Sequence, residues 1–204
     1  MDRKIFITGI GTGIGKTISS AVLCEAWQAD YWKPVQAGDL DATDRMKVAE
    51  LISNEKTVAH PEQFLLKEPA APYMASRKEG FEIQQEDFQF PSTSNKLLIE
   101  GAGGLFVPIN PHYFFIDFIV DHQLPVVLVV SPYLGAINHT LLSLEALQKR
   151  SIPVKGLILN GNNEAAAFIA DATKIPVLLE LPQTENLNKN WVKQQAQKVN
   201  PLNF

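Results

Sequence analysis

A glycine-rich loop near the start of the chain constrains the fold more than any other feature. Residues 5–7 are Ile, Phe and Ile, and residues 8–17 read Thr-Gly-Ile-Gly-Thr-Gly-Ile-Gly-Lys-Thr. A strand that runs through such a loop into a helix directs backbone N–H groups and the positive end of the helix dipole at a polyphosphate. We therefore expect residues 9–17 to bind phosphate groups, with Lys16 on the β- and γ-phosphates and Thr17 on Mg²⁺.

The loop is one residue longer than the common G-x-x-x-x-G-K-[ST] pattern. That pattern requires glycine at position 10, where this chain has Ile10, and the preceding glycine is Gly9. The alternative interpretation is a tight strand-to-helix turn with a chance lysine. Because the strand, the glycines, the Lys-Thr pair and the helix all agree with a phosphate site, we favour that site.

Size and composition indicate one globular domain over residues 1–204. Apolar residues make up 46% of the chain and charged residues 20%, and the formal net charge is −4. Without a long basic run, nucleic acid is not an expected partner. The single cysteine, Cys24, excludes an intrachain disulfide and is expected to be buried on a helix. The apolar stretch 125–130 is too short to cross a bilayer and the N-terminus lacks a signal peptide, so we expect a cytoplasmic protein.

Strand-length apolar runs alternate with helical segments along most of the chain. We expect strands at 4–8, 97–99, 126–130, 154–159 and 176–179, with a weaker one at 31–35. We expect helices at 16–28, 137–149, 165–173 and 187–199. This alternation predicts an α/β fold, a mostly parallel sheet with helices on both faces.

The region 36–95 interrupts the alternation. It contains polar connectors, a loop at 91–95 and short helical pieces at about 43–53, 70–79 and 83–88. An excursion of this length usually has a function or covers a site. Ligands of open parallel sheets bind beyond the carboxyl ends of the strands. The segments to inspect are therefore 9–17, 33–38, 100–104, 131–138, 160–162 and 180–184.

Carboxylates near two of these ends are candidate Mg²⁺ ligands. Glu100 ends an apolar run and precedes Gly-Ala-Gly-Gly, so it is suited to a Mg²⁺ shell facing the phosphate loop. The alternative is an exposed glutamate in a turn. A second carboxylate could come from Asp44, for which Asp39 and Asp41 compete, while Thr43 or Asp44 could merely cap a helix.

A lysine, an asparagine and a histidine follow other strands. Lys33 could reach the same phosphates as Lys16, and two lysines with a metal would balance the charge of phosphoryl transfer; taken alone, such a lysine is more often solvated. Asn160 could contact a base edge or serve as a left-handed turn residue. We expect His139 to be packed or hydrogen-bonded rather than catalytic, and the remaining histidines show no metal-ligand spacing: His60, His112 and His122.

Together these segments resemble the dethiobiotin synthetase family, ATP-dependent enzymes of biotin synthesis. The matching segments are 8–9 with 15–17, 33–38, 68–72, 100–104 and 134–139. The resemblance spans most of the chain and implies a P-loop NTPase-like fold, ATP as co-substrate, Mg²⁺ and a homodimer. It also implies a ligase that forms a cyclic urea from 7,8-diaminononanoate and CO₂ through a carbamate and a carbamic-phosphoric mixed anhydride.

The resemblance also implies roles for individual residues. Lys16 and Lys33 would be catalytic, and the Mg²⁺ ligands would be Thr17, Asp44 and Glu100. Nucleotide contacts would come from Gly13, Ile14, Gly15, Lys16, Thr17, Ile18, Asp44, Glu100, Gly101, Ala102, Gly103, Asn160, Pro182, Gln183 and Thr184. The diamine site would comprise Thr12, Ala37, Pro72 and Gly103, with Leu134, Gly135 and Asn138 closing the pocket of the partner subunit. Family members often have Ser or Thr where this chain has Ala37.

Two other classes remain open from the sequence. An ATP-dependent amidoligase acting on a cobyrinic-acid-like substrate usually carries a glutaminase domain, for which 204 residues leave no room. A nucleotide-sensing module or a partner-regulated dimeric ATPase is the non-enzymatic alternative. Such ATPases carry a lysine where this chain has Gly11, and a degenerate sensing domain would be expected to lose Lys33 or Glu100.

Overall fold

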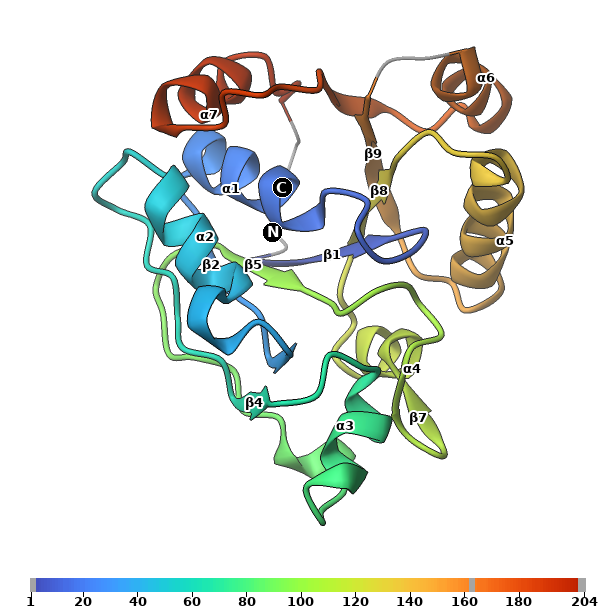
Figure 1. Ribbon diagram of the computed structural model, residues 1–204. Helices are drawn as coiled ribbons and strands as arrows, with labels where there is room; N and C mark the ends of the chain where they lie inside the picture. Colours follow the sequence, from blue (N-terminus) through green and yellow to red (C-terminus); the bar gives the residue numbers. More distant parts are fainter. Residues whose placement is uncertain (1–2, 162–163, 202–204) are drawn as a thin grey trace.

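A six-stranded parallel sheet forms the centre of the computed structural model, which describes residues 3–161 and 164–201 (Figure 1). Across the sheet the strands are β10 (Val177–Leu181), β9 (Val154–Asn160), β8 (Val126–Val130), β1 (Lys4–Gly9), β5 (Leu97–Glu100) and β2 (Asp30–Trp32). The predicted α/β fold is confirmed. The expected helix 165–173 corresponds to a helix from Glu164 to Thr173, while Asn162 of the segment 160–162 lies outside the described residues.

The strand register aligns the carboxyl ends of the central strands. Ile7 of β1 pairs with Glu100 of β5 on one side and with Val127 of β8 on the other. The last residue of β5 is therefore level with the strand that enters the glycine-rich loop. This alignment lets a side chain from β5 reach the residues of the loop.

Helices cover both faces of the sheet. One face carries α1 (Lys16–Trp27), α2 (Asp44–Leu51) and α7 (Lys189–Ala196), and the other carries α4 (Phe115–Asp121), α5 (Ala136–Lys149) and α6 (Glu164–Thr173). Side chains of β1 alternate between them, since Ile7 packs with α1 whereas Phe6 packs with α4. Cys24 of α1 is fully buried, as predicted, and burial raises the pKa of its thiol.

Part of the region 36–95 forms a small lobe beside the sheet, around β4 (Phe64–Leu66) and α3 (Pro72–Lys78), whereas its helix α2 packs against α1 (Figure 1). In the lobe, β3 (Val35–Ala37) pairs in parallel with β4, and α3 packs against both strands. The 3₁₀ turns η1 (Leu40–Ala42) and η2 (Gln85–Asp87) and the hairpin β6 (Pro108–Asn110)–β7 (Tyr113–Phe114) complete the short elements. The lobe brings residues 69–72 toward the glycine-rich loop.

Several element predictions were wrong in detail. The expected strand 31–35 is split, because β2 ends at Trp32 and Val35 begins a strand of a different sheet; Pro34 between them has no N–H to donate to a ladder. The expected helix 83–88 is only the 3₁₀ turn η2, and the expected helix 187–199 is shortened to α7. Helix α4 was not predicted, because four of its seven side chains are buried and its sequence lacks a clear polar face.

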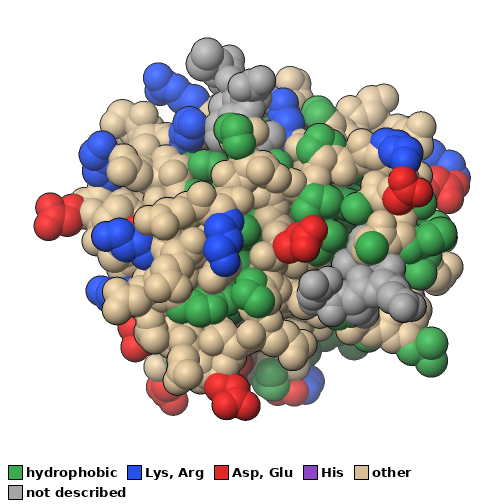
Figure 2. Space-filling model, turned by 90° about the horizontal axis from the view of Figure 1, so that it is seen from above, with side chains coloured by type: hydrophobic (Ala, Val, Ile, Leu, Met, Phe, Trp, Pro, Cys, Tyr) green, Lys and Arg blue, Asp and Glu red, His purple; other side chains and the backbone are tan. Residues whose placement is uncertain are grey.

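Charged and apolar side chains are interspersed on the face of the molecule that Figure 2 shows. On the face in Figure 2, Lys and Arg side chains are spread out, with neutral surface between them. In residues 3–161 and 164–201, no helix is both long enough and apolar enough to cross a membrane. The cytoplasmic location and the single-domain organisation stay predictions.

Leucine-to-alanine substitutions test how strands β5 and β4 are packed. Leu98 of β5 is 1% exposed beneath α1, whereas Leu65 of β4 is 52% exposed. We expect Leu98→Ala to lower the free energy of unfolding by about 2–5 kcal/mol, because it leaves a cavity in the core. The matched Leu65→Ala should lose less than about 1 kcal/mol. Urea unfolding measures both, and equal losses would contradict this packing.

Candidate nucleotide site

A cavity of about 650 Å³ opens beside the glycine-rich loop at the carboxyl edge of the sheet. Four segments far apart in the sequence line it: the adjacent strands β1 and β5 bring two of them together, and the segments 33–47 and 69–72 supply the rest of the lining. The lining residues are 12–18, then Lys33, Gln36, Ala37, Asp39, Asp44 and Lys47, then 69–72, and finally Glu100, Ala102, Gly103 and Val107.

The glycine-rich loop is held in a conformation that leaves the start of α1 open. Gly15 precedes α1 with φ of 90°, and no side chain caps the helix, so its first N–H groups can bind an anion. A Cβ on Gly15 would lie 2.0 Å from Asn160 Nδ2, so only glycine fits. Asn160 Nδ2 donates to the carbonyl oxygen of Ile14 at 2.8 Å, and Lys16 Nζ donates to that of Gly11 at 2.8 Å. Both bonds shape the loop for a phosphate group.

Two carboxylates converge on the hydroxyl of Thr17. Thr17 Oγ1 lies 2.9 Å from Asp44 Oδ1 and 3.2 Å from Glu100 Oε1. Glu100 is only 1% exposed, so the interpretation as an exposed turn residue is wrong. Lys33 is buried and forms an ion pair with Asp44, so the interpretation as a solvated lysine is also wrong.

The structure distinguishes among the three aspartates of the segment 39–44. Thr43 is the N-cap of α2, since its hydroxyl accepts from the N–H of Met46 at 3.3 Å. Asp44 is thereby free to face Thr17. Asp39 also lines the cavity, in a left-handed conformation, and Asp41 is exposed and outside the lining.

Burial and neighbouring charges shift the pKa values of this cluster. Burial, together with the nearby charge of Lys33, lowers the pKa of Lys16 to about 8, against the attraction of Glu100 and Asp44. Burial favours protonated Asp44, but the adjacent Lys33 and the hydrogen bonds from Lys33 and Thr17 outweigh it and hold the pKa of Asp44 below its usual value. Asp44 is therefore an anion at neutral pH.

The donor set fits Mg²⁺. The structure, over the residues it describes, holds no group of three or more His, Cys, Asp or Glu side chains that could bind a metal by themselves. The site instead offers one hydroxyl, from Thr17, and two carboxylates, from Asp44 and Glu100. Mg²⁺ binds one or two carboxylates and completes its octahedron with phosphate oxygens and water.

The structure places some of the predicted contact residues in the cavity and others outside it. Thr12, Ala37, Pro72 and Gly103 line the cavity, as do residues 13–18. Gly101 packs against the ring of Phe6 instead. Outside the lining lie Asn160, Pro182, Gln183 and Thr184, together with Leu134, Gly135 and Asn138.

Two alternatives at single residues are resolved. The left-handed turn residue after β9 is Gly161, with φ of 97°, and not Asn160. His139 is hydrogen-bonded, as predicted, with its Nδ1 2.7 Å from the hydroxyl oxygen of Tyr133.

Four residues of the site region were missed. Ser20 and Tyr31 both donate to Glu100 Oε2, Gln36 accepts from the N–H of Asp44 at 3.4 Å, and Lys47 lies 3.9 Å from Asp44 Oδ1. Burial, and then the charge of Glu100, raise the pKa of Tyr31 well above its usual value, so it carries its proton. Helical spacing could have found Ser20, which is one turn after Thr17.

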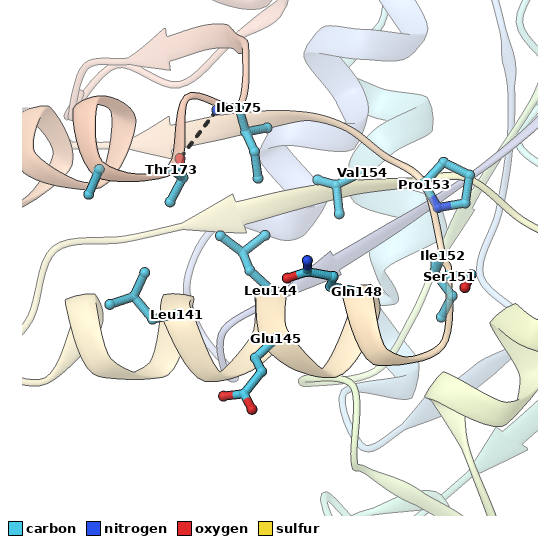
Figure 3. Close-up of a pocket in the computed structure, with 11 residues that line it drawn as sticks. Leu141, Leu144, Glu145, Gln148, Ser151, Ile152, Pro153, Val154, Thr173 and Ile175 are labelled. Carbon is cyan, nitrogen blue, oxygen red and sulfur yellow. Dashed lines mark hydrogen bonds between the residues drawn. The ribbon is translucent and has the colours of Figure 1, made fainter.

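A second cavity, of about 510 Å³, lies between α5 and α6. Figure 3 shows Leu141 and Leu144 along α5, with Val154 and Ile175 opposite them. The only ionisable residue in its lining is Glu145, whose carboxylate is paired with Lys149 Nζ at 2.6 Å. The cavity at the glycine-rich loop therefore remains the candidate site.

A strand, phosphate loop and helix at the carboxyl edge of a parallel sheet define a P-loop nucleotide-binding protein. Solved structures share this fold. The septum site-determining protein MinD from Pyrococcus horikoshii, complexed with Mg-ADP, matches with a TM-score of 0.59 and 12% identity over 96% of this chain and 95% of that one. A plasmid partition protein from Borrelia burgdorferi, bound to AMPPNP, matches with a TM-score of 0.58 and 12% identity over 96% and 94%. At such identities the likeness shows the fold alone.

Sequence relatives define the family. A family profile described as an AAA domain matches residues 3–190. The ATP-dependent dethiobiotin synthetase BioD of Cytophaga hutchinsonii is 44% identical over 97% of both chains, and that of Christiangramia forsetii is 42% identical over 97% of this chain and 96% of its own. The chain belongs to the dethiobiotin synthetase family.

The pKa of Lys16 predicts how nucleotide affinity depends on pH. Phosphate oxygens need the charged lysine, so binding must add a proton once the pH exceeds about 8. We expect the affinity for a non-hydrolysable ATP analogue to be constant below that pH and to fall above it, by up to about tenfold per pH unit. Calorimetric titration between about pH 7.5 and pH 9.5 measures this. Lys16→Arg, which keeps its charge, should show a flat profile; a flat wild-type profile would refute the assignment.

Proposed function

We propose that this enzyme forms the cyclic urea of dethiobiotin from 7,8-diaminononanoate, CO₂ and ATP. The observation that carries the proposal is the ion pair of buried Lys33 with partly buried Asp44, next to Thr17, Glu100 and the phosphate loop, in a chain of the dethiobiotin synthetase family. This arrangement places opposite charges around one γ-phosphate position. It suits phosphoryl transfer to a small anionic acceptor.

The reaction has three steps. One amine of the substrate attacks CO₂ and loses a proton, which gives a carbamate. A carbamate oxygen then attacks the γ-phosphorus, and ADP leaves, which gives the carbamic-phosphoric mixed anhydride. The second amine attacks the carbonyl carbon of this anhydride, loses a proton and expels phosphate, which closes the five-membered urea ring.

Residues of this chain supply the electrostatic environment for these steps. Lys16 would bind the β- and γ-phosphates, and Lys33 would stabilise the carbamate and the transferring phosphoryl group. The side chains that would hold Mg²⁺ are Thr17, Asp44 and Glu100, and the bound ion would neutralise charge on the β- and γ-oxygens. The diamine would bind in the part of this cavity that is lined by Thr12, Ala37, Pro72 and Gly103.

Phosphate release tests the function directly. The protein is incubated with ATP, Mg²⁺ and bicarbonate, with and without 7,8-diaminononanoate, and the product is identified by mass spectrometry. Diamine-dependent release together with a cyclic urea supports the proposal. ATP binding without diamine-dependent turnover would instead indicate a nucleotide-sensing module or a ligase for another substrate.

Substitution of the two lysines separates their roles. We expect Lys33→Ala to lower kcat by at least about 10²-fold while nucleotide affinity is largely kept, because Lys33 acts on the transferring group. Lys16→Ala should weaken both ATP binding and turnover. Calorimetry and steady-state kinetics measure the two effects. Normal turnover in Lys33→Ala would contradict its assigned role.

A homodimer would complete the substrate pocket. Leu134 is fully exposed, and other exposed apolar side chains lie near it in the fold, namely Phe106, Tyr133 and Leu142. Gly135 precedes α5 without a side-chain cap, so the first N–H groups of that helix could bind the substrate carboxylate, together with Asn138. Because these residues lie outside the cavity of their own chain, we propose that they act on the cavity of the partner.

A charge at Leu134 tests the dimer. We expect Leu134→Glu to shift the protein to the monomer and to reduce turnover, because the carboxylate cannot be buried in an apolar interface. Sedimentation velocity measures the oligomeric state. The control is Leu187→Glu at another exposed leucine, which should leave the dimer intact. An unchanged dimer in Leu134→Glu would exclude this surface.

A further inference from the structure

Two hydroxyl groups outside the cavity lining converge on one oxygen of Glu100. Ser20 Oγ donates to Glu100 Oε2 at 2.7 Å, and Tyr31 OH donates to the same oxygen at 3.0 Å. The other oxygen, Oε1, lies 3.2 Å from Thr17 Oγ1 and faces the cavity. Ser20 and Tyr31 are fully buried, so water does not compete for these bonds.

We propose that Tyr31 and Ser20 are positioning residues, which fix the carboxylate of Glu100 so that it presents a single oxygen to Mg²⁺. The inference rests on the proposed function, because it concerns the metal–nucleotide site. It extends that function by assigning a role to two side chains that neither touch the substrates nor bind the metal.

The chemistry of Mg²⁺ explains why such positioning matters. The ion requires near-octahedral geometry, which a carboxylate satisfies best with one oxygen. A carboxylate with two equivalent free oxygens can rotate or chelate the ion. Because two donors hold Oε2, Glu100 can offer only Oε1 to the metal, and the orientation of the carboxylate is fixed. Donors behind a ligand typically change metal affinity by about 10–100-fold.

The fold explains how these two hydroxyls reach Glu100. Ser20 lies one helical turn after Thr17, so α1 presents both hydroxyls to the same carboxylate. Tyr31 of β2 pairs with Leu98 of β5, which lies two residues before Glu100. The ring of Tyr31 packs in the core under α1. The ring fills the core and the hydroxyl serves Glu100, so removal of the oxygen alone separates the two contributions.

Metal binding to Tyr31→Phe tests the proposal. Mn²⁺ serves as the probe, with electron paramagnetic resonance reporting free ion in the presence of a non-hydrolysable ATP analogue. We expect Tyr31→Phe to bind Mn²⁺ about tenfold more weakly than wild type, with unchanged affinity for the analogue when metal is absent. In turnover, half-maximal rate should need about tenfold more Mg²⁺, while kcat at saturating Mg²⁺ and the KM for the diamine stay near wild type.

Matched variants complete the design. Tyr113→Phe removes another buried tyrosine hydroxyl, in the core on the opposite face of the sheet, and should leave Mn²⁺ affinity unchanged. Ser20→Ala removes the second donor and should also weaken Mn²⁺ binding, so the test stands if Tyr31→Phe does not fold.

Each outcome has a distinct meaning. A wild-type protein that binds no Mn²⁺ with the analogue would refute the proposed function. Wild-type binding with equal binding in Tyr31→Phe and Ser20→Ala would overturn the positioning role alone. Weakened binding of the metal-free analogue to the same extent would also overturn it, because that result indicates a general structural defect.

Discussion

Four charged side chains share one partly enclosed cavity, and the rest of the structure depends on their mutual placement. Lys16 and Lys33 face Asp44 and Glu100, and each of these groups loses hydration on burial. A buried charge without a partner costs several kcal/mol, which is comparable to the whole free energy of unfolding of a typical protein. The ion pair between Lys33 and Asp44 and the donors to Glu100 compensate this loss. The cluster is therefore both the chemical centre and a structural constraint.

The fold brings these charges together from four separate places in the chain. Strand β5 ends at Glu100, which pairs with Ile7 of β1. Lys16 is the first residue of α1, directly after the glycine-rich loop. Asp44 begins α2, where Thr43 caps the helix and Gln36 binds the N–H of Asp44. Because these side chains are held by neighbouring hydrogen bonds before any ligand arrives, they need little reorganisation when charge develops on a transferring phosphoryl group.

The same fold serves proteins of other functions, so the lobe matters for specificity. MinD and plasmid partition proteins share the sheet and helices at only 12% identity. In this chain, residues 69–72 and the segment around Ala37 close the cavity beside the phosphate loop. The fold alone therefore does not set the function of this chain. Its function depends on the residues that surround the common phosphate-binding core.

The sequence by itself determined the parallel α/β fold, the phosphate loop with Lys16 and Thr17, and Glu100 at a strand end, because hydrophobic periodicity and glycine spacing are local properties. Only the tertiary structure decided that Asp44 rather than Asp41 faces Thr17, that Lys33 is buried, and that Tyr31 and Ser20 bind Glu100. It also split the expected strand 31–35 between two sheets. These outcomes depend on which distant segments meet and how far water is excluded, and neither property is local in the chain.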